Sequence, residues 1–173
     1  SQKAEGFAYL GIIYSEWKNK TKIIKMIKNG LKFSRGNSRI KALCYLANAK
    51  MYTKQKHYKR ALKYYNLSKR SFNKSKDIKT SIGIQGEIGL FLMKRKKFKR
   101  AIPLLLNAIN EYSKLRMEYD VIINLYNVAI CYKNLKKYTY AFKHAKRAEN
   151  IAKKIDVDIP IISELVKKLR TAY

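Results

Sequence analysis

Acidic side chains are scarce in this chain of 173 residues. It contains 11 Asp and Glu against 40 Lys and Arg, which gives a formal net charge of +29. No acidic residue occurs between Trp17 and Lys76. A codon bias toward A and T favours Lys, but it should raise Glu as well, and Glu occurs only seven times. Two explanations of the charge therefore stand side by side: attraction of a polyanion or acidic partner, and solubility alone.

Cysteine and long apolar runs are also scarce, and each absence excludes a class of protein. Cys44 and Cys131 stand far apart, without a CxxC motif or a His-rich cluster. A disulfide scaffold and a metal site are therefore excluded, and we expect free thiols. No apolar run approaches the roughly 20 residues of a membrane span, and the first residues lack the pattern of a signal peptide. We expect a cytoplasmic protein without a cofactor and, because the chain does not begin with Met, a fragment or a processed form.

A sequence pattern recurs with a period of 40 residues, a length typical of solenoid repeats. Three alanines mark it, and each stands three residues after an aromatic residue and seven residues before another small residue. A further small residue precedes each alanine by twelve positions. The corresponding residues are Tyr58, Ala61, Ser68 and Ala49; Phe98, Ala101, Ala108 and Gly89; and Tyr138, Ala141, Ala148 and Ala129. A weaker first copy, 38 residues before the second, carries Gly11, Ile23 and Gly30.

These spacings fit pairs of amphipathic helices joined by tight turns, with small residues where the helices cross. The pattern resembles the tetratricopeptide repeat, which has a small residue and Tyr on its first helix (helix A), then an aromatic residue and two Ala on its second (helix B). The resemblance implies a right-handed all-α solenoid of four helix pairs with a C-terminal capping helix, in a single domain over residues 1–173. The repeats cover about residues 4–37, 38–77, 78–117 and 118–157, and the capping helix covers 158–172. Repeats of this length are similar to those of kinesin light chains, Pins/LGN-type adaptors and bacterial peptide-pheromone regulators.

The pattern predicts nine helices, at about residues 4–17, 21–34, 38–54, 58–74, 78–95, 98–114, 118–135, 138–154 and 158–172. The last should begin with Asp158 as N-cap and Pro160 in the first turn, where the missing N–H costs nothing. Pro103 is expected near the start of its helix for the same reason. The glycines of the segment GIQGEIG share one helix face, so we expect close helix packing there, or a bare stripe for a ligand backbone, rather than a phosphate-binding loop.

The resemblance also implies a binding site, because helix A lines the concave groove of these repeats and groove positions recur at fixed offsets from its small residue. The groove should have an apolar floor with ammonium groups along one side. The implied residues are Leu46, Lys50 and Lys54 in the second repeat; Leu90, Met93 and Lys94 in the third; and Tyr126, Asn127, Ile130, Lys133 and Asn134 in the fourth. Such a groove suits an acidic or amphipathic peptide. We therefore predict a non-enzymatic protein-binding scaffold; the alternative is that these lysines are only a solvated face.

Two alternative functions fit the same sequence. The predicted turns and B helices carry a second basic surface, densest at residues 94–100, which suits RNA, DNA or an anionic membrane surface. Tyrosines such as Tyr58 and Tyr140 interleave with it, but core packing explains most of them better than base stacking. The other alternative is the peptide-sensing domain of a transcriptional regulator. His57 and His144 lack a nearby acidic or Cys partner in sequence, so we expect solvated structural residues rather than catalysts.

Overall fold

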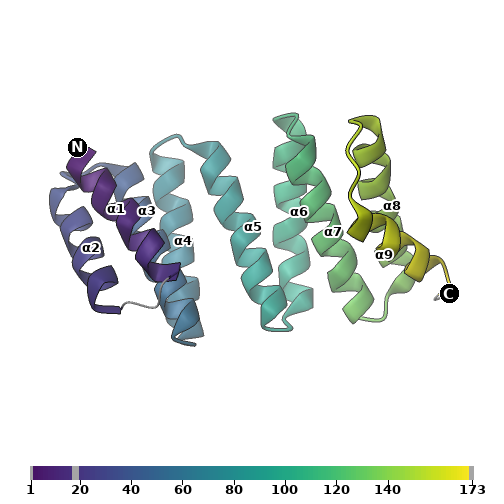
Figure 1. Cartoon of the computed structure of the whole chain (residues 1–173), viewed down its shortest axis with the longest axis horizontal. Helices are drawn as coiled ribbons and strands as arrows, with labels where there is room; N and C mark the ends of the chain where they lie inside the picture. Colours follow the sequence, from purple (N-terminus) through teal and green to yellow (C-terminus); the bar gives the residue numbers. More distant parts are fainter. Residues whose placement is uncertain (1, 17–19, 172–173) are drawn as a thin grey trace. The chain divides into compact units, whose positions relative to one another are not determined.

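The computed structural model describes residues 2–16 and 20–171 and shows, within them, nine α-helices and no strand (Figure 1). The side chains of residues 14–16 and 20 are not described. The helices are α1 (Gln2–Glu16), α2 (Lys20–Phe33), α3 (Ser38–Lys54), α4 (Tyr58–Lys74), α5 (Ile78–Lys94), α6 (Phe98–Lys114), α7 (Glu118–Asn134), α8 (Tyr138–Lys154) and α9 (Pro160–Arg170). About 85% of the described residues are helical, so the predicted fold class, an all-α solenoid of helix pairs, is confirmed.

The helix ends agree with the predicted ranges to within two residues, except that the predicted ends at residues 17 and 172 lie outside the described part of the chain. The predicted cap of α9 was wrong by one position. Ile159, not Asp158, is the N-cap residue, and no side chain caps this end. Pro160 is the first helical residue, because its fixed φ is already suited to a helix start.

Pro103 is the sixth residue of α6, near the start of the helix as predicted, and lies in its second turn. At this position it removes the hydrogen bond that an N–H would donate to the carbonyl of Lys99. Lys99 and Pro103 are both exposed, so water can reach that carbonyl. The helix continues through Pro103 to Lys114.

The chain forms two compact units, residues 1–84 (unit 1) and 85–173 (unit 2), with the boundary inside α5. In unit 1, α1 packs on α2 and α3, and α4 packs on α3. The helices approach closely at small residues: a Cβ on Gly30 would lie 2.6 Å from the sulfur of Cys44. Ser68 is fully buried on α4 and donates a hydrogen bond of 2.9 Å to the carbonyl of Ala42 on α3. Cys44 and Cys131 are both free and buried, as predicted.

Unit 2 has the same close approach between its helices. α7 packs on α6 and on α8. Ala101 and Ala108 are fully buried on α6, and a Cβ on Gly89 would lie 2.6 Å from Cδ2 of Leu105. Gly89 therefore serves helix packing, as predicted, because any larger residue would displace Leu105.

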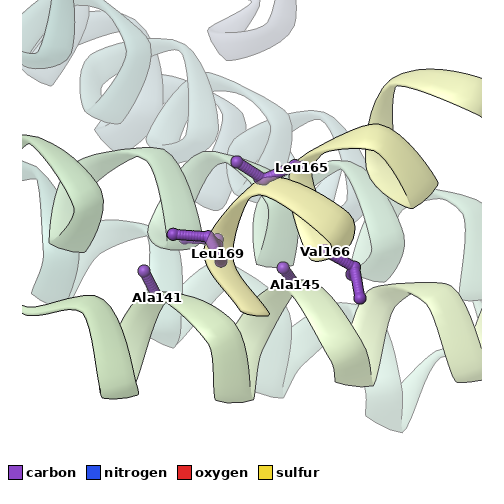
Figure 2. Packing of buried hydrophobic residues seen from close by; sticks show 6 residues of the cluster. Ala141, Ala145, Leu165, Val166 and Leu169 are labelled. Carbon is purple, nitrogen blue, oxygen red and sulfur yellow. The ribbon is translucent and has the colours of Figure 1, made fainter. Parts of the chain in front are cut away.

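Helix α9 covers α8, as expected of a capping helix. Its Leu165, Val166 and Leu169 are buried in one cluster with Ala141 and Ala145 of α8 (Figure 2). The two alanines leave room for the larger side chains of α9. Without α9, this apolar face of α8 would be open to water.

The turns between helices share one backbone conformation. From the α3–α4 turn onward, each contains one non-glycine residue with φ between 53° and 60°. The following N–H then bonds to a carbonyl five residues back, as from Lys97 to Leu92 at 2.9 Å, which is the Schellman motif that ends helices. Gly or Asn is usual at positive φ, because a Cβ crowds the backbone there. The residues found are instead Lys56, Lys76, Lys96, Arg116, Lys136 and Asp156, at steps of 20.

Trp in place of Ala101 or Ala141 should destabilise the fold, because both alanines are fully buried and a larger side chain forces the helices apart. We expect each variant to lose about 1–3 kcal/mol of unfolding free energy in urea titrations. Ser113→Trp is the matched control, since Ser113 is exposed on the same helix as Ala101, and it should change stability by less than about 0.5 kcal/mol. Equal effects of the three substitutions would show that the repeat pattern is out of register.

Replacing Lys96 by Gly should make the protein more stable than replacing it by Ala. Both variants lose the charge, but only Gly relieves the crowding at a φ of 54°, so we expect a difference of about 1 kcal/mol in unfolding free energy. At Lys99, in the first turn of α6, the order should reverse, because Gly weakens a helix relative to Ala by up to about 1 kcal/mol. If Gly and Ala variants had the same order of stability at Lys96 and at Lys99, the backbone conformation would not explain the effect at Lys96.

Candidate functional site

The predicted groove residues of unit 1 lie on α3, and one of them is misplaced. Lys54 is exposed and Lys50 is half-buried, as a groove edge requires. Leu46, however, is only 8% exposed and belongs to the core, so the prediction of an open apolar floor at this position was wrong. The reason is the neighbouring helix: α1 approaches α3 beside Leu46, where a Cβ on Gly11 would lie 3.4 Å from the side chain of Ala47.

Unit 2 holds the larger part of the predicted groove, on the second half of α5 and on α7. The two helices are neighbours, since a Cβ on Gly86 of α5 would lie 3.4 Å from the amide oxygen of Asn124 on α7. The exposed predicted residues are Leu90, Lys94, Lys133 and Asn134, and Met93 is half-buried. Ile123, which the sequence analysis did not select, is 41% exposed. Its spacing from Ile130 places it on the same face of α7.

Tyr126 and Ile130 are less open than predicted. Both are half-buried, and both pack against the cluster that α9 forms with α8. This cluster, which also includes Ala129 of α7, thus covers part of both side chains. Tyr126 and Ile130 therefore expose only part of their surface to the predicted groove.

The amides of α7 are mostly engaged by their own helix. The side-chain nitrogen of Asn124 donates to the carbonyl of Asp120 at 2.8 Å, and that of Asn134 donates to the carbonyl of Ile130 at 2.8 Å. Asn127, predicted to hold a peptide backbone, is only 8% exposed. It lies deeper than expected, because its neighbours along α7 are buried core residues.

Several of the acidic residues form ion pairs, and two of them meet at one arginine of unit 1. Arg39, on α3, contacts Glu5 of α1 and lies 3.4 Å from a carboxylate oxygen of Asp77. Asp77 also accepts a hydrogen bond from the backbone N–H of Thr80 in the first turn of α5. Burial raises the pKa of Asp77, but the hydrogen bonds from Thr80 and Arg39 outweigh it and lower this pKa overall. The junction therefore ties α1, α3 and the start of α5 together.

Some acids of unit 2 form ion pairs within a single helix. Glu149 of α8 is 8% exposed and lies 2.5 Å from the ammonium group of Lys146, whose hydrogen bond lowers the pKa of Glu149. Glu111 pairs with Lys114 at 2.7 Å. Glu164 of α9 accepts a hydrogen bond from the ammonium group of Lys168 on the next turn. For Lys94 and Lys133, no acidic partner is seen among the described residues.

The second basic surface lies at the turns within repeats. In unit 2, the α5–α6 and α7–α8 turns stand at the same end (Figure 1). Every Lys and Arg at these two turns is exposed: Lys94, Arg95, Lys96, Lys97, Lys99, Arg100, Lys133, Lys136 and Lys137. Tyr138 beside them is half-buried, whereas Tyr140 is 56% exposed. Core packing therefore explains Tyr138, and Tyr140 is open to a partner.

His144 differs from the prediction of a solvated residue. Its ring stacks on that of Tyr132, with centroids 5.5 Å apart and planes at 7°, and its Nδ1 is buried without a partner. Burial, followed by the charges of Arg147 and Lys143, lowers the pKa of His144. His57 is exposed, as predicted. In the described part of the chain, no three His, Cys, Asp or Glu side chains come together as metal ligands.

Comparisons with known proteins give a fold and no family. No known protein family matches this chain. No curated protein matches it either. Solved structures do match, 25 chains in all, among them BtubC (BKLC) from P. vanneervenii. That match has a TM-score of 0.74 and 18% sequence identity over 89% of this chain, and it spans 65% of the BtubC chain. At this identity the similarity shows a shared helical-repeat fold. None of the described helices is both long and apolar enough to cross a membrane.

Asp77→Ala should destabilise unit 1 by about 1–2 kcal/mol at pH 7, because it removes both a helix cap and an ion pair. Since the folded pKa of Asp77 is lowered, this stabilisation is present above the unfolded value of about 3.9 and is lost as the pH falls through the folded value. In urea titrations, Asp77→Ala should therefore be less stable than the wild type at pH 7, but the two should have about the same unfolding free energy near pH 2. Asp158→Ala is the control and should be neutral at both, because Asp158 caps no helix. A pH-independent loss in Asp77→Ala would remove the electrostatic explanation.

Proposed function

We propose that this chain is a tetratricopeptide-type scaffold that binds an acidic or amphipathic segment of another protein and catalyses no reaction. The observation that carries the proposal is the helix-A face of unit 2. There, Leu90 and Ile123 are 38% and 41% exposed, on the neighbouring helices α5 and α7. The exposed ammonium groups of Lys94 and Lys133 stand at the C-terminal ends of the same helices.

The chemistry of this face limits what it can bind. Exposed apolar side chains favour a partner with apolar residues, because burial of both surfaces releases water. Cations at the edge favour a partner with carboxylates, and they discriminate against basic segments. The likeness to BtubC supports a repeat scaffold and does not bear on the partner. In unit 1, α3 carries lysines at the equivalent predicted positions, the half-buried Lys50 and the exposed Lys54.

The double variant Lys94→Glu, Lys133→Glu should weaken this binding. The probe is a random 12-residue peptide library displayed on phage and selected on the wild-type protein; we expect enriched peptides to combine Asp or Glu with Leu, Ile or Phe. Selected peptides should bind the double variant about tenfold more weakly or worse, because two attractions become repulsions. Lys50→Glu, Lys54→Glu tests unit 1 in the same way.

The matched control is Lys143→Glu, Lys154→Glu, which makes the same change of charge on exposed positions of α8. It should leave peptide affinity within about twofold of the wild type and should not alter the circular dichroism spectrum. Equal losses in both double variants would mean that only the net charge matters. Selection of peptides without acidic residues would contradict the proposal.

A second candidate is a polyanion-binding surface at the turns, and the backbone gives a specific reason for it. At the described turns within repeats, Lys occupies all three positions of positive φ, namely Lys56, Lys96 and Lys136, although Gly or Asn would relieve the crowding. The chain has 12 Asn, and none stands at these positions. Retention of basic side chains where they strain the backbone supports a role for their charge.

A salt titration with a 20-nucleotide oligothymidylate tests this candidate. A surface that neutralises about six phosphates should lose on the order of a thousandfold in affinity between 50 and 200 mM salt. Peptide binding in the groove should depend less on salt, because burial of apolar surface is barely screened. No oligonucleotide binding at 50 mM salt would exclude the nucleic-acid function.

A further inference from the structure

Unit 1 contains a pocket of about 430 Å³ between α2, α3 and the start of α4. This volume lies within the range of small-ligand sites. The pocket is lined by Ile24, Ile27, Lys28, Leu31, Asn48, Met51, Tyr52, Gln55, His57, Arg60 and Tyr64. None of the predicted groove residues is among them.

The pocket and the predicted groove lie on different faces of α3. Successive residues of a helix are turned by about 100°, so the mean direction of Asn48 and Gln55 differs by roughly 130° from that of Lys50 and Lys54. The site is therefore separate from the groove, and the inference below does not depend on the proposed function.

The floor of the pocket is aliphatic. Ile27 is 5% exposed and Met51 is 4% exposed, so both reach the pocket from the core. Ile24 stands at the mouth with 47% of its surface exposed. Ile27 and Met51 offer this floor only apolar surface, which suits a hydrocarbon body, while the polar side chains of Asn48 and Gln55 also line the pocket.

One wall combines aromatic rings with a cation. The rings of Tyr52 and Tyr64 stack, with centroids 5.5 Å apart and planes at 15°. The guanidinium of Arg60 lies over the ring of Tyr52, with its central carbon 5.7 Å from the centroid. The His57 ring lies edge-on to the Tyr52 ring, with centroids 6.2 Å apart. Contact with the ring holds Arg60 at the wall of the pocket, and the exposed Lys28 stands on α2.

No acidic side chain lines the pocket. The described acids of unit 1 are Glu5 and Asp77, and both are bound to Arg39. The two cations of the pocket therefore present a positive potential that nothing lining it neutralises. An arginine fork matches a carboxylate, and the aliphatic floor matches an apolar body.

The corresponding place in unit 2 shows which features are particular to unit 1. Shifted by the repeat spacing of 80 residues, Tyr52 and Arg60 become Tyr132 and Tyr140, which stack on each other. Shifted by 78 residues, Lys28 becomes Leu106. The aromatic wall recurs in unit 2 without counterparts of Arg60 and Lys28, although Lys137 takes the place of His57 and lies 6.0 Å from the centroid of the Tyr140 ring.

We propose that the α2–α3–α4 pocket binds a carboxylate with an apolar body, which packs on Ile27 and Met51 while the carboxylate pairs with Arg60 and Lys28. The carboxylate comes either from a free organic acid or from the C-terminus of a peptide that ends in an apolar residue. Both present the same chemistry to the pocket. The probes are 4-phenylbutyrate for the free acid and N-acetyl-Ala-Phe for the peptide terminus.

Methyl NMR of the whole chain, with assigned Ile and Met resonances, measures the binding. At least one probe should shift the Ile27 and Met51 methyl signals saturably, with a Kd in the millimolar range or tighter. The neutral amides of the two probes should bind at least about tenfold more weakly, because they lose the charge-assisted bonds. Acetate, which has the charge without the apolar body, should not saturate these signals. The stronger of the two probes identifies the source of the carboxylate.

Arg60→Gln should weaken binding by about tenfold or more, and Arg70→Gln should not, although both residues are exposed on α4. Neither substitution touches the core, so the methyl spectrum should otherwise be preserved. Three results would overturn the proposal: no saturable shift with either probe, equal binding of acid and amide, or equal effects of the two Arg variants. None of them bears on the groove of unit 2, which is tested by its own variants.

Discussion

The close approach of neighbouring helices at small side chains is the constraint on which the rest of this structure depends. Gly30 against Cys44, and Gly89 against Leu105, leave no space for a Cβ. Ala101 and Ala141 are fully buried in the same way. Because the helices of each pair are held at a fixed distance and register, the helix-A face and the turns recur from one repeat to the next. The α2–α3–α4 pocket lies at one such recurring place, between a helix pair and the helix before it. The candidate binding surfaces lie where large or charged side chains stand on this frame.

Most of the fold could be predicted because local chemistry and the repeat pattern agree. The step of 40 residues in small and aromatic residues predicted helix ends to within two residues. Single positions failed where a neighbour outside the pattern intervened. Leu46 is covered because α1 approaches α3, and Tyr126 and Ile130 are half-buried against the cluster that includes α9. Such contacts depend on which helix comes next, and no spacing within one repeat encodes them.

The candidate sites were less predictable than the fold. Exposure of Lys94 and Lys133 followed from the groove register, but the pocket beside Tyr52 did not, since its walls come from three helices. A signal was available in hindsight: Tyr52 and Tyr132 hold equivalent places, whereas Arg60 has no basic counterpart at Tyr140. The positive φ of Lys56, Lys96 and Lys136 had no signal, because the sequence lacks the Gly or Asn that usually marks it. The positive surplus itself follows from composition, because the chain has 40 Lys and Arg against 11 Asp and Glu.

Hydrogen–deuterium exchange with and without a selected acidic peptide tests the central claim most directly, because it locates the bound segment without assuming a site. Binding on the helix-A face of unit 2 predicts slower exchange in the second half of α5 and in α7, with α6 and α8 unchanged. Protection confined to α6 and α8, or to the turns alone, would contradict the claim. It would place the partner on the second basic surface instead.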